Sequence, residues 1–213
     1  MRRVNNEDGN SLVYILWLLS MCGVIILIVL NITGVYITKQ NASTATEQAA
    51  LAGTAVMMNA TDEAIKDFDK DLIKSLEQKT DDSLKSIETL VEEKTREYKN
   101  TGKSDQTARI QAYNAIIPER LSKYPEMLEV FEDKFSSRQL ANELNSEINY
   151  ILNENGTKVD TSELVLSNTD WRIEVKASAS FSSITDGKHI NEFTKDIPQK
   201  GVGPKLAYLE YIY

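Results

Sequence analysis

The chain begins with a long run of apolar residues. Residues 9–38 contain no Asp, Glu, Lys or Arg, and residues 11–30 are almost entirely apolar. A helix of about 20 residues, rising about 1.5 Å per residue, covers about 30 Å, which is the thickness of the hydrocarbon core of a bilayer. The pattern predicts a transmembrane helix at residues 11–37, preceded by a short tail of residues 1–10.

The few charges before this run indicate its orientation. Arg2 and Arg3 precede the span, and the neighbouring acidic residues Glu7 and Asp8 count little in the positive-inside rule. We therefore expect a single-pass protein of the cell membrane, with a cytoplasmic N-terminus and an extracellular C-terminal domain.

Small residues follow the span. Alanine favours helix more than any other residue, and no strong stop signal occurs here, so the helix is expected to continue from the bilayer as one long helix over residues 38–100. Ala45, Ala49, Ala52 and Gly53 recur at helical spacing and would let another helix approach closely. The alternative is that the alanines only favour helix formation.

The second part of this stretch is amphipathic. Apolar residues recur at steps of three and four, which is typical of a heptad-like seam. Polar residues interrupt the seam at residues 80–83. The pattern is therefore compatible with a sustained coiled coil that forms a homo-oligomer, with a break in the helix, or with packing of the helix against the outer domain. The seam positions are Ile65, Phe68, Leu72, Leu76, Ser83, Ile87 and Leu90 or Val91.

Residues 101–213 mix helical and strand patterns. Helices are expected at 105–117, ended by Pro118, and at 138–154. Apolar residues then alternate with polar ones over 171–181, which is typical of a strand buried on one face. Asp186-Gly187 predicts a hairpin turn and a returning strand at 188–197. Further strands are expected at 163–167 and 206–213, with Gly201, Gly203 and Pro204 forming the turn before the last.

These elements predict an α+β fold. A small antiparallel sheet must cover its apolar face, and the preceding helices are the available cover. The expected organisation is a cytoplasmic tail (1–10), a transmembrane helix (11–37), a long extracytoplasmic helix (38–100) and an outer α+β domain (101–213).

The composition argues against most metal, redox and catalytic-triad chemistry. The 213 residues include one cysteine, Cys22, and one histidine, His189, so an internal disulfide and a structural zinc site of four Cys or His ligands are excluded. The 24 basic and 32 acidic residues give a net charge of −8, which argues against binding nucleic acid. The sequence contains no nucleophile motif with which His189 could form a catalytic triad. We expect no enzyme activity and no cofactor.

The stretch directly after the span carries a resemblance. Residues 45–53, A-T-E-Q-A-A-L-A-G, resemble the A-D-A-A-A-L-A-G stretch of TadE/TadG-like proteins of Flp (tight adherence) pilus assembly. The resemblance implies a pilin-like plan, a membrane anchor and other pilus or secretion-assembly proteins as partners.

The same resemblance raises the question of processing. Related prepilins are cut after a glycine and carry glutamate at the fifth mature position. The candidate site here is Gly9-Asn10, and the fifth position holds Tyr14. An uncut, membrane-retained protein therefore fits better than a cleaved filament subunit.

Two functions follow as hypotheses. The first is a bitopic, non-enzymatic component of a Tad/Flp-like pilus or secretion assembly, which acts through helix packing and contacts of its outer domain. The alternative is a membrane-tethered module that binds an extracellular ligand at the cell surface.

Overall fold

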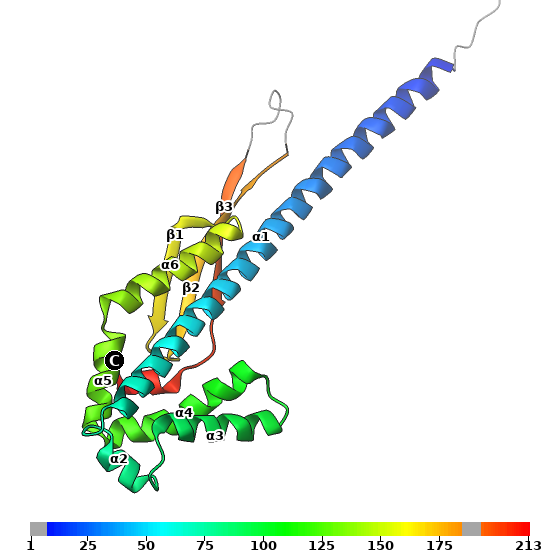
Figure 1. The fold of residues 1–213 in the computed structure, drawn as a ribbon. Helices are drawn as coiled ribbons and strands as arrows, with labels where there is room; N and C mark the ends of the chain where they lie inside the picture. The colour runs from blue at the N-terminus through cyan, green and yellow to red at the C-terminus, as the bar shows by residue number, and fades with distance from the viewer. Residues whose placement is uncertain (1–7, 185–192) are drawn as a thin grey trace, which may run out of the picture.

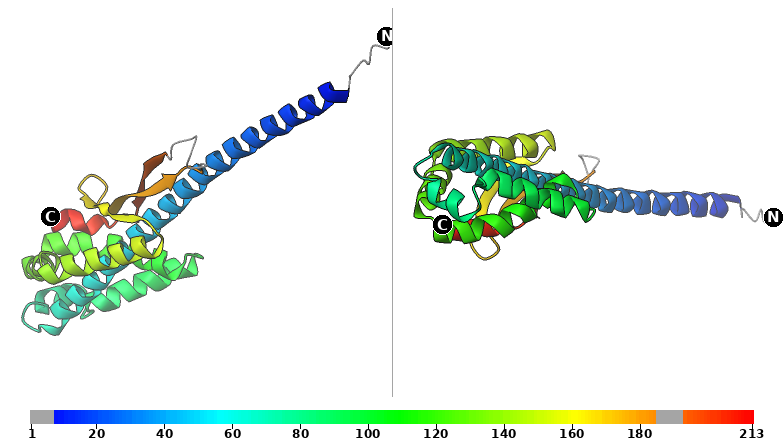
Figure 2. Two further views of the ribbon diagram at one scale, coloured as in Figure 1. Left: turned by 90° about the horizontal axis from the view of Figure 1, so that it is seen from above. Right: turned by 60° about the horizontal axis from the view of Figure 1, so that its bottom comes forward.

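One helix joins the two halves of the molecule. A computed structural model describes residues 8–184 and 193–213, and in it helix α1 (Asp8–Lys70) is continuous (Figure 1). Its first part projects alone, whereas its second part lies inside the outer domain (Figure 2). The first part is long and apolar enough to cross a membrane, and its most apolar 18-residue window is not buried by any described residue. The expected apolar helix is therefore confirmed.

Shorter helices surround the second part of α1. Three of them begin at a serine whose side chain accepts a hydrogen bond from a backbone N–H in the first turn, which is the usual N-cap: Ser86, Ser104 and Ser137. The helices are α2 (Leu76–Asp81), α3 (Ile87–Asn100), α4 (Asp105–Lys123), α5 (Pro125–Phe135) and α6 (Arg138–Glu154), followed near the C-terminus by the 3-10 helix η1 (Ala207–Tyr211).

The strands form one antiparallel sheet in the order β1-β2-β3. They are β1 (Lys158–Ser167), β2 (Arg172–Ser182) and β3 (Thr194–Val202). In the central strand, Val175 pairs with Leu164 on one side and with Gly201 on the other. The alternating residues Ile173, Val175 and Phe181 are buried, as predicted, and the α+β class is confirmed. The opposite face is not fully exposed, because Glu174 and Ser178 are also buried.

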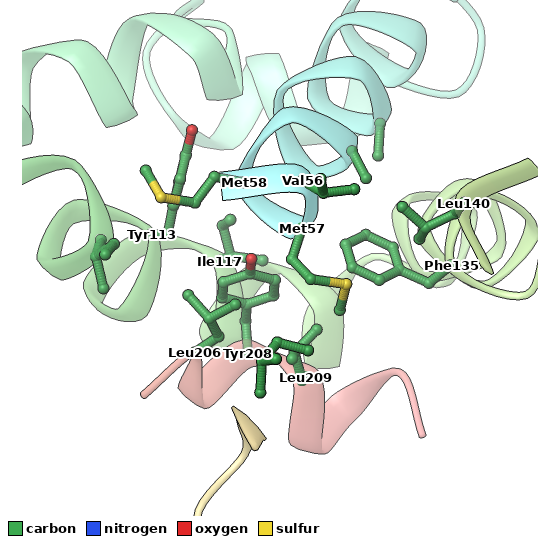
Figure 3. Packing of buried hydrophobic residues seen from close by; sticks show 14 of the residues in the cluster. Val56, Met57, Met58, Tyr113, Ile117, Phe135, Leu140, Leu206, Tyr208 and Leu209 are labelled. Carbon is green, nitrogen blue, oxygen red and sulfur yellow. The ribbon is translucent and has the colours of Figure 1, made fainter. Parts of the chain in front are cut away.

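The core is built around α1. Figure 3 shows Met57 of α1 beside Phe135 of α5, and Tyr208 and Leu209 of η1 beneath the same turn of α1. All of these side chains are 0 to 5% exposed. The part of α1 from Ala42 to Phe68 thus lies at the centre of the outer domain and is not a stalk that leads to it.

The long helix ends earlier than the sequence pattern indicated. It stops at Lys70, and α2 and α3 follow as separate helices, so the helix expected over residues 38–100 is interrupted. The Asp71 carboxylate explains the stop, because its Oδ1 accepts hydrogen bonds from the backbone N–H groups of Ile73 and Lys74 in place of continued helix. Leu72 and Leu76 are 76% and 65% exposed, so neither belongs to a buried seam.

One expected boundary inside the outer domain is also wrong, and one helix was missed. Pro118 does not end its helix, since α4 continues to Lys123. The stop is Pro125, which disfavours helical dihedrals in the residue before it, and Tyr124 has φ −116° and ψ 99°. Helix α5, which begins at Pro125, was not expected.

The C-terminal segment is not the predicted strand. Residues 207–211 form η1, in which Leu209 donates its N–H to the carbonyl of Leu206, three residues earlier. Both leucines are fully buried, and this spacing of three suits a 3-10 turn. Gly201 lies within β3 and not in a turn. The predicted Asp186-Gly187 turn and His189 lie outside the described residues.

Candidate interaction surfaces

The small-residue face of α1 is covered by the chain's own sheet. Ala45 and Ala49 are 0% exposed. At Gly201 of β3, an added Cβ would lie closer than 3.0 Å to the backbone carbonyl of Thr46, and at Gly203 it would meet the Thr54 side chain equally closely. Strand β3 and the segment after it therefore run directly against the α1 backbone, which is possible because residues on both sides are small.

The other residues expected to pack helices have the same neighbours. An added Cβ at Gly53 would lie 3.0 Å from Ile148 of α6 and 3.1 Å from Ile173 of β2. Ala52 is half-buried. The residues that were expected to receive a partner helix thus lie together on one stretch of α1, and the outer domain already occupies most of that stretch.

A polar cluster fastens α1 to α4. Asp62 Oδ1 accepts hydrogen bonds from Arg109 Nη2, at 2.6 Å, and from the Tyr113 hydroxyl, at 2.5 Å. Burial, with help from the nearby carboxylate, raises the pKa of Tyr113 above its ordinary value, so the phenol stays a donor. At the preceding residue of α1, the hydroxyl of Thr61 shares a buried hydrogen bond of 2.6 Å with the hydroxyl of Tyr208. The arrangement is that of a structural clamp, because each polar group has a protein partner.

At the end of the molecule farthest from the N-terminus, residues 71–85 form what we call the distal segment, which contains α2 (Figure 1). Ion pairs hold it against α4. Arg120 donates to both carboxylate oxygens of Asp82, at 2.8 and 3.1 Å, and Lys123 pairs with Asp81 at 2.8 Å. Gln78 is buried and donates to Asp82 at 2.6 Å. The segment is therefore a fixed part of the surface.

The distal segment exposes apolar side chains in an unusual way. Large apolar residues are normally the most buried, yet here Ile73 is 89% exposed and Leu84 is 82% exposed. Ser83 and Leu84 both have positive φ, 59° and 65°, a conformation that costs about 1 to 2 kcal/mol for residues other than glycine. Strain of this kind is often retained where a surface is used. The exposed members are Leu72, Ile73, Leu76 and Leu84.

Within residues 8–184 and 193–213, no three or more His, Cys, Asp or Glu side chains gather as they would around a metal ion. A hollow of about 300 Å³ beside Asp133 and Lys134 is open to solvent. The expected absence of a cofactor and of enzyme activity stays a prediction.

The candidate processing site lies at the beginning of α1. Gly9 and Asn10 belong to its first turn, and Tyr14 follows on the same helix, 63% exposed. Nothing in this geometry selects between a cut and an uncut chain, so retention of residues 1–9 also stays a prediction.

Comparison with known proteins supports the resemblance noted in residues 45–53. A family model described as putative Flp pilus-assembly TadE/G-like matches residues 9–64. The match begins at the apolar part of α1 and ends beside Asp62, so it covers the anchor and most of the α1 surface on which the outer domain packs. No curated protein and no solved structure matches the chain.

Proposed function

We propose, from the match of residues 9–64 to that family, that this protein is a bitopic, non-enzymatic component of a Tad/Flp-like pilus or secretion assembly. The first part of α1 anchors it in the cell membrane, its N-terminus is cytoplasmic, and its outer domain is extracellular. The observation that carries the proposal is that the matched residues 9–64 lie within helix α1. The first part of this helix is long and apolar enough to cross a membrane, and the outer domain packs around its second part.

The structure favours a different contact surface for such a component than the small-residue face of α1 that the sequence indicated. A partner helix would have to displace part of the outer domain to reach Ala45 or Ala49, because both are already 0% exposed. The distal segment offers an accessible surface, since Leu72, Ile73 and Leu84 are exposed and their backbone is held by α4. We assign the contact between the outer domain and other assembly proteins to this segment.

A gene deletion tests the function. A strain without this protein should lose surface filaments or secretion of the assembly's substrate, measured in sheared fractions, and the wild-type chain should restore them. The alternative function, a tethered module that binds a surface ligand, gives the opposite result: filaments persist and only ligand binding is lost.

Point variants test the contact. Leu84→Asp and Ile73→Asp should fail to restore filaments although an immunoblot finds normal amounts of protein in the membrane. Thr80→Asp adds the same charge at an exposed position of α2 and should restore them. Restoration by all three variants would refute the assignment to the distal segment and leave the assembly function standing.

A mass measurement tests processing. The chain should remain in the membrane at its full length, with residues 1–9 attached. A product beginning at Asn10 in the sheared fraction would instead identify Gly9 as a cleavage site and the protein as a filament subunit.

A further inference from the structure

One face of α1 stays open along most of the helix. An α-helix turns by about 100° per residue, so positions three or four residues apart lie on the same face. Steps of this size lead from Leu12, in the apolar part of α1, to Ala55, inside the outer domain, through residues that are all exposed or half-buried. We call this face the open stripe. It consists of Leu12, Ile15, Leu19, Gly23, Ile26, Leu30, Thr33, Ile37, Asn41, Thr44, Gln48, Leu51 and Ala55.

The outer domain packs on both sides of the open stripe and leaves it accessible. On one side, Asn155 at the end of α6 donates a hydrogen bond to Gln48 at 3.3 Å. On the other side, α4 is held by the clamp at Asp62. Figure 1 shows α6 along this part of α1 and the α3–α4 pair diverging from it. Between these contacts Leu51 is 45% exposed, whereas the preceding residue, Ala50, is 0% exposed. A further helix can therefore reach the stripe.

The open stripe carries no charge. Its members include no Asp, Glu, Lys or Arg, although such residues make up 26% of the chain. The acidic residue beside it, Glu47, accepts a hydrogen bond from the Ser43 hydroxyl at 3.4 Å, on the side away from the stripe. A contact between identical copies around a two-fold axis requires a neutral surface, because a charge near the axis would face its own equivalent.

The span decides how two copies can meet. Copies that are anchored in one membrane by α1 point in the same direction, so their α1 helices run parallel and each stripe residue faces its own equivalent. Gly23 favours close approach, since nothing lies within 4 Å of its added Cβ. A contact over residues 12–55 is about 65 Å long and about 10 Å wide. It covers about 650 Å² on each copy, which is close to the about 800 Å² per partner of a standard interface.

We propose that the open stripe is the contact surface of a parallel homodimer, in which a second copy of this chain occupies it. The stripe differs from the small-residue face, whose members Ala45 and Ala49 are already covered. A two-fold contact uses the same face of both copies, so the assembly closes at two chains and leaves both distal segments accessible. The inference deepens the proposed function and rests on the membrane anchoring contained in it.

Disulfide cross-linking of the full chain in phosphatidylcholine vesicles tests the dimer. Parallel helices with axes about 8 to 10 Å apart place equivalent Cα atoms about 3 to 6 Å apart on the facing sides, and about 9 to 11 Å apart a quarter-turn away. A disulfide requires Cα atoms within about 7 Å. In a Cys22→Ser background, Ile37→Cys and Leu51→Cys should each form a covalent dimer when an oxidant is added, measured on a non-reducing gel.

Two exposed positions outside the stripe give matched controls. Tyr36 is next to Ile37 and is 67% exposed against 53%, but it lies about 100° around the helix. Tyr150 of α6 is 58% exposed, against 45% for Leu51. Tyr36→Cys and Tyr150→Cys should not cross-link. Adding Leu51→Arg to the Ile37→Cys chain should lower its cross-linked fraction about tenfold, because like charges would meet at the axis, and adding Tyr150→Arg should leave that fraction unchanged.

Each other outcome has a distinct meaning. Equal cross-linking at all four positions indicates random collision and overturns the dimer. No cross-linking at Ile37→Cys and Leu51→Cys, in chains that float with the vesicles, also overturns it and leaves the stripe to lipid or to another protein. Both results leave the assembly function to the gene deletion. A chain that does not float with the vesicles refutes the membrane anchoring, and with it both this inference and the proposed function.

Discussion

Gly201→Ala is the sharpest test of the observed packing of β3 on α1. The added Cβ would overlap the backbone carbon and oxygen of Thr46, and backbone atoms cannot turn aside as a side chain can. The φ of Gly201 is not positive, so alanine is strained only by this collision. Strand β3 would have to withdraw from α1 at Thr46.

The cost can be estimated from this geometry. Overpacking in a dense core typically costs about 1 to 3 kcal/mol, and a collision with backbone belongs at the upper end of that range. A loss of about 3 kcal/mol lowers the melting temperature of a domain of this size by about 6 to 12 °C. The same loss reduces the ratio of folded to unfolded protein roughly a hundredfold.

The assay is thermal unfolding of the full chain in detergent micelles. A Trp17→Phe background leaves Trp171, which packs against the core, as the fluorescent reporter. Gly23→Ala is the matched control, because nothing lies within 4 Å of its added Cβ. Gly34→Ala should be intermediate, since it meets only the movable ring of Phe181. A Gly201→Ala protein that melts within about 1 °C of the Gly23→Ala control would refute the packing.

Three further predictions concern the outer domain. Asp62→Ala should cost about 1 to 3 kcal/mol in unfolding free energy because the buried Tyr113 hydroxyl loses its acceptor, and adding Tyr113→Phe should recover part of that loss in a double-mutant cycle. Burial acts to raise the pKa of Asp82, but its hydrogen bonds from Arg120 and Gln78 outweigh burial and hold that pKa below its ordinary value. The stability that this carboxylate contributes is therefore present above its unfolded pKa and is lost as the pH falls through about 4 and below. Proteolysis within residues 71–85 should increase at that low pH. The variant Asp82→Asn should remove this pH dependence. Ser83→Gly should raise the unfolding free energy by up to about 1 kcal/mol, measured by thermal melts, because glycine adopts its φ of 59° without strain.

The elements that could be predicted from the sequence are those whose burial follows a simple period. In β2 the apolar residues alternate without exception from Ile173 to Phe181, and one face of that strand is buried. In α6 the cap residue and the apolar face predict the same helix start. The Ser137 side chain accepts a hydrogen bond from the N–H of Leu140, and Leu140 is buried. Local and tertiary preferences point the same way in both elements.

The missed helix had a recognisable signal. Met127, Phe131 and Phe135 of α5 recur every four residues and are 0 to 5% exposed, and Pro125 at the first helical position favours a helix start. The misplaced end at Pro118 concealed this pattern. For η1 the local signal was misleading, because aromatic and branched residues favour strands whereas burial of Leu206 and Leu209 on one side requires a turn every three residues.

The small-residue face shows why a site may be visible in a sequence while its partner is not. Small side chains allow any backbone to come close, whether it belongs to a helix of another protein or to a strand of the same chain. Ala49 carries no information that separates these cases. What decides between them is that Gly201 and Gly203, about 150 residues later, are also small, and this long-range match is not a local pattern.

This ambiguity changes how mutations of the face must be interpreted. A charged residue at Ala49 would not simply face a partner helix, because this position is 0% exposed and lies inside the outer domain. An unpaired buried charge costs several kcal/mol, comparable with the whole stability of a small domain. Loss of association in an Ala49→Glu protein would then follow from unfolding of the outer domain. Only variants at exposed positions, such as Leu84→Asp, separate loss of a contact from loss of the fold.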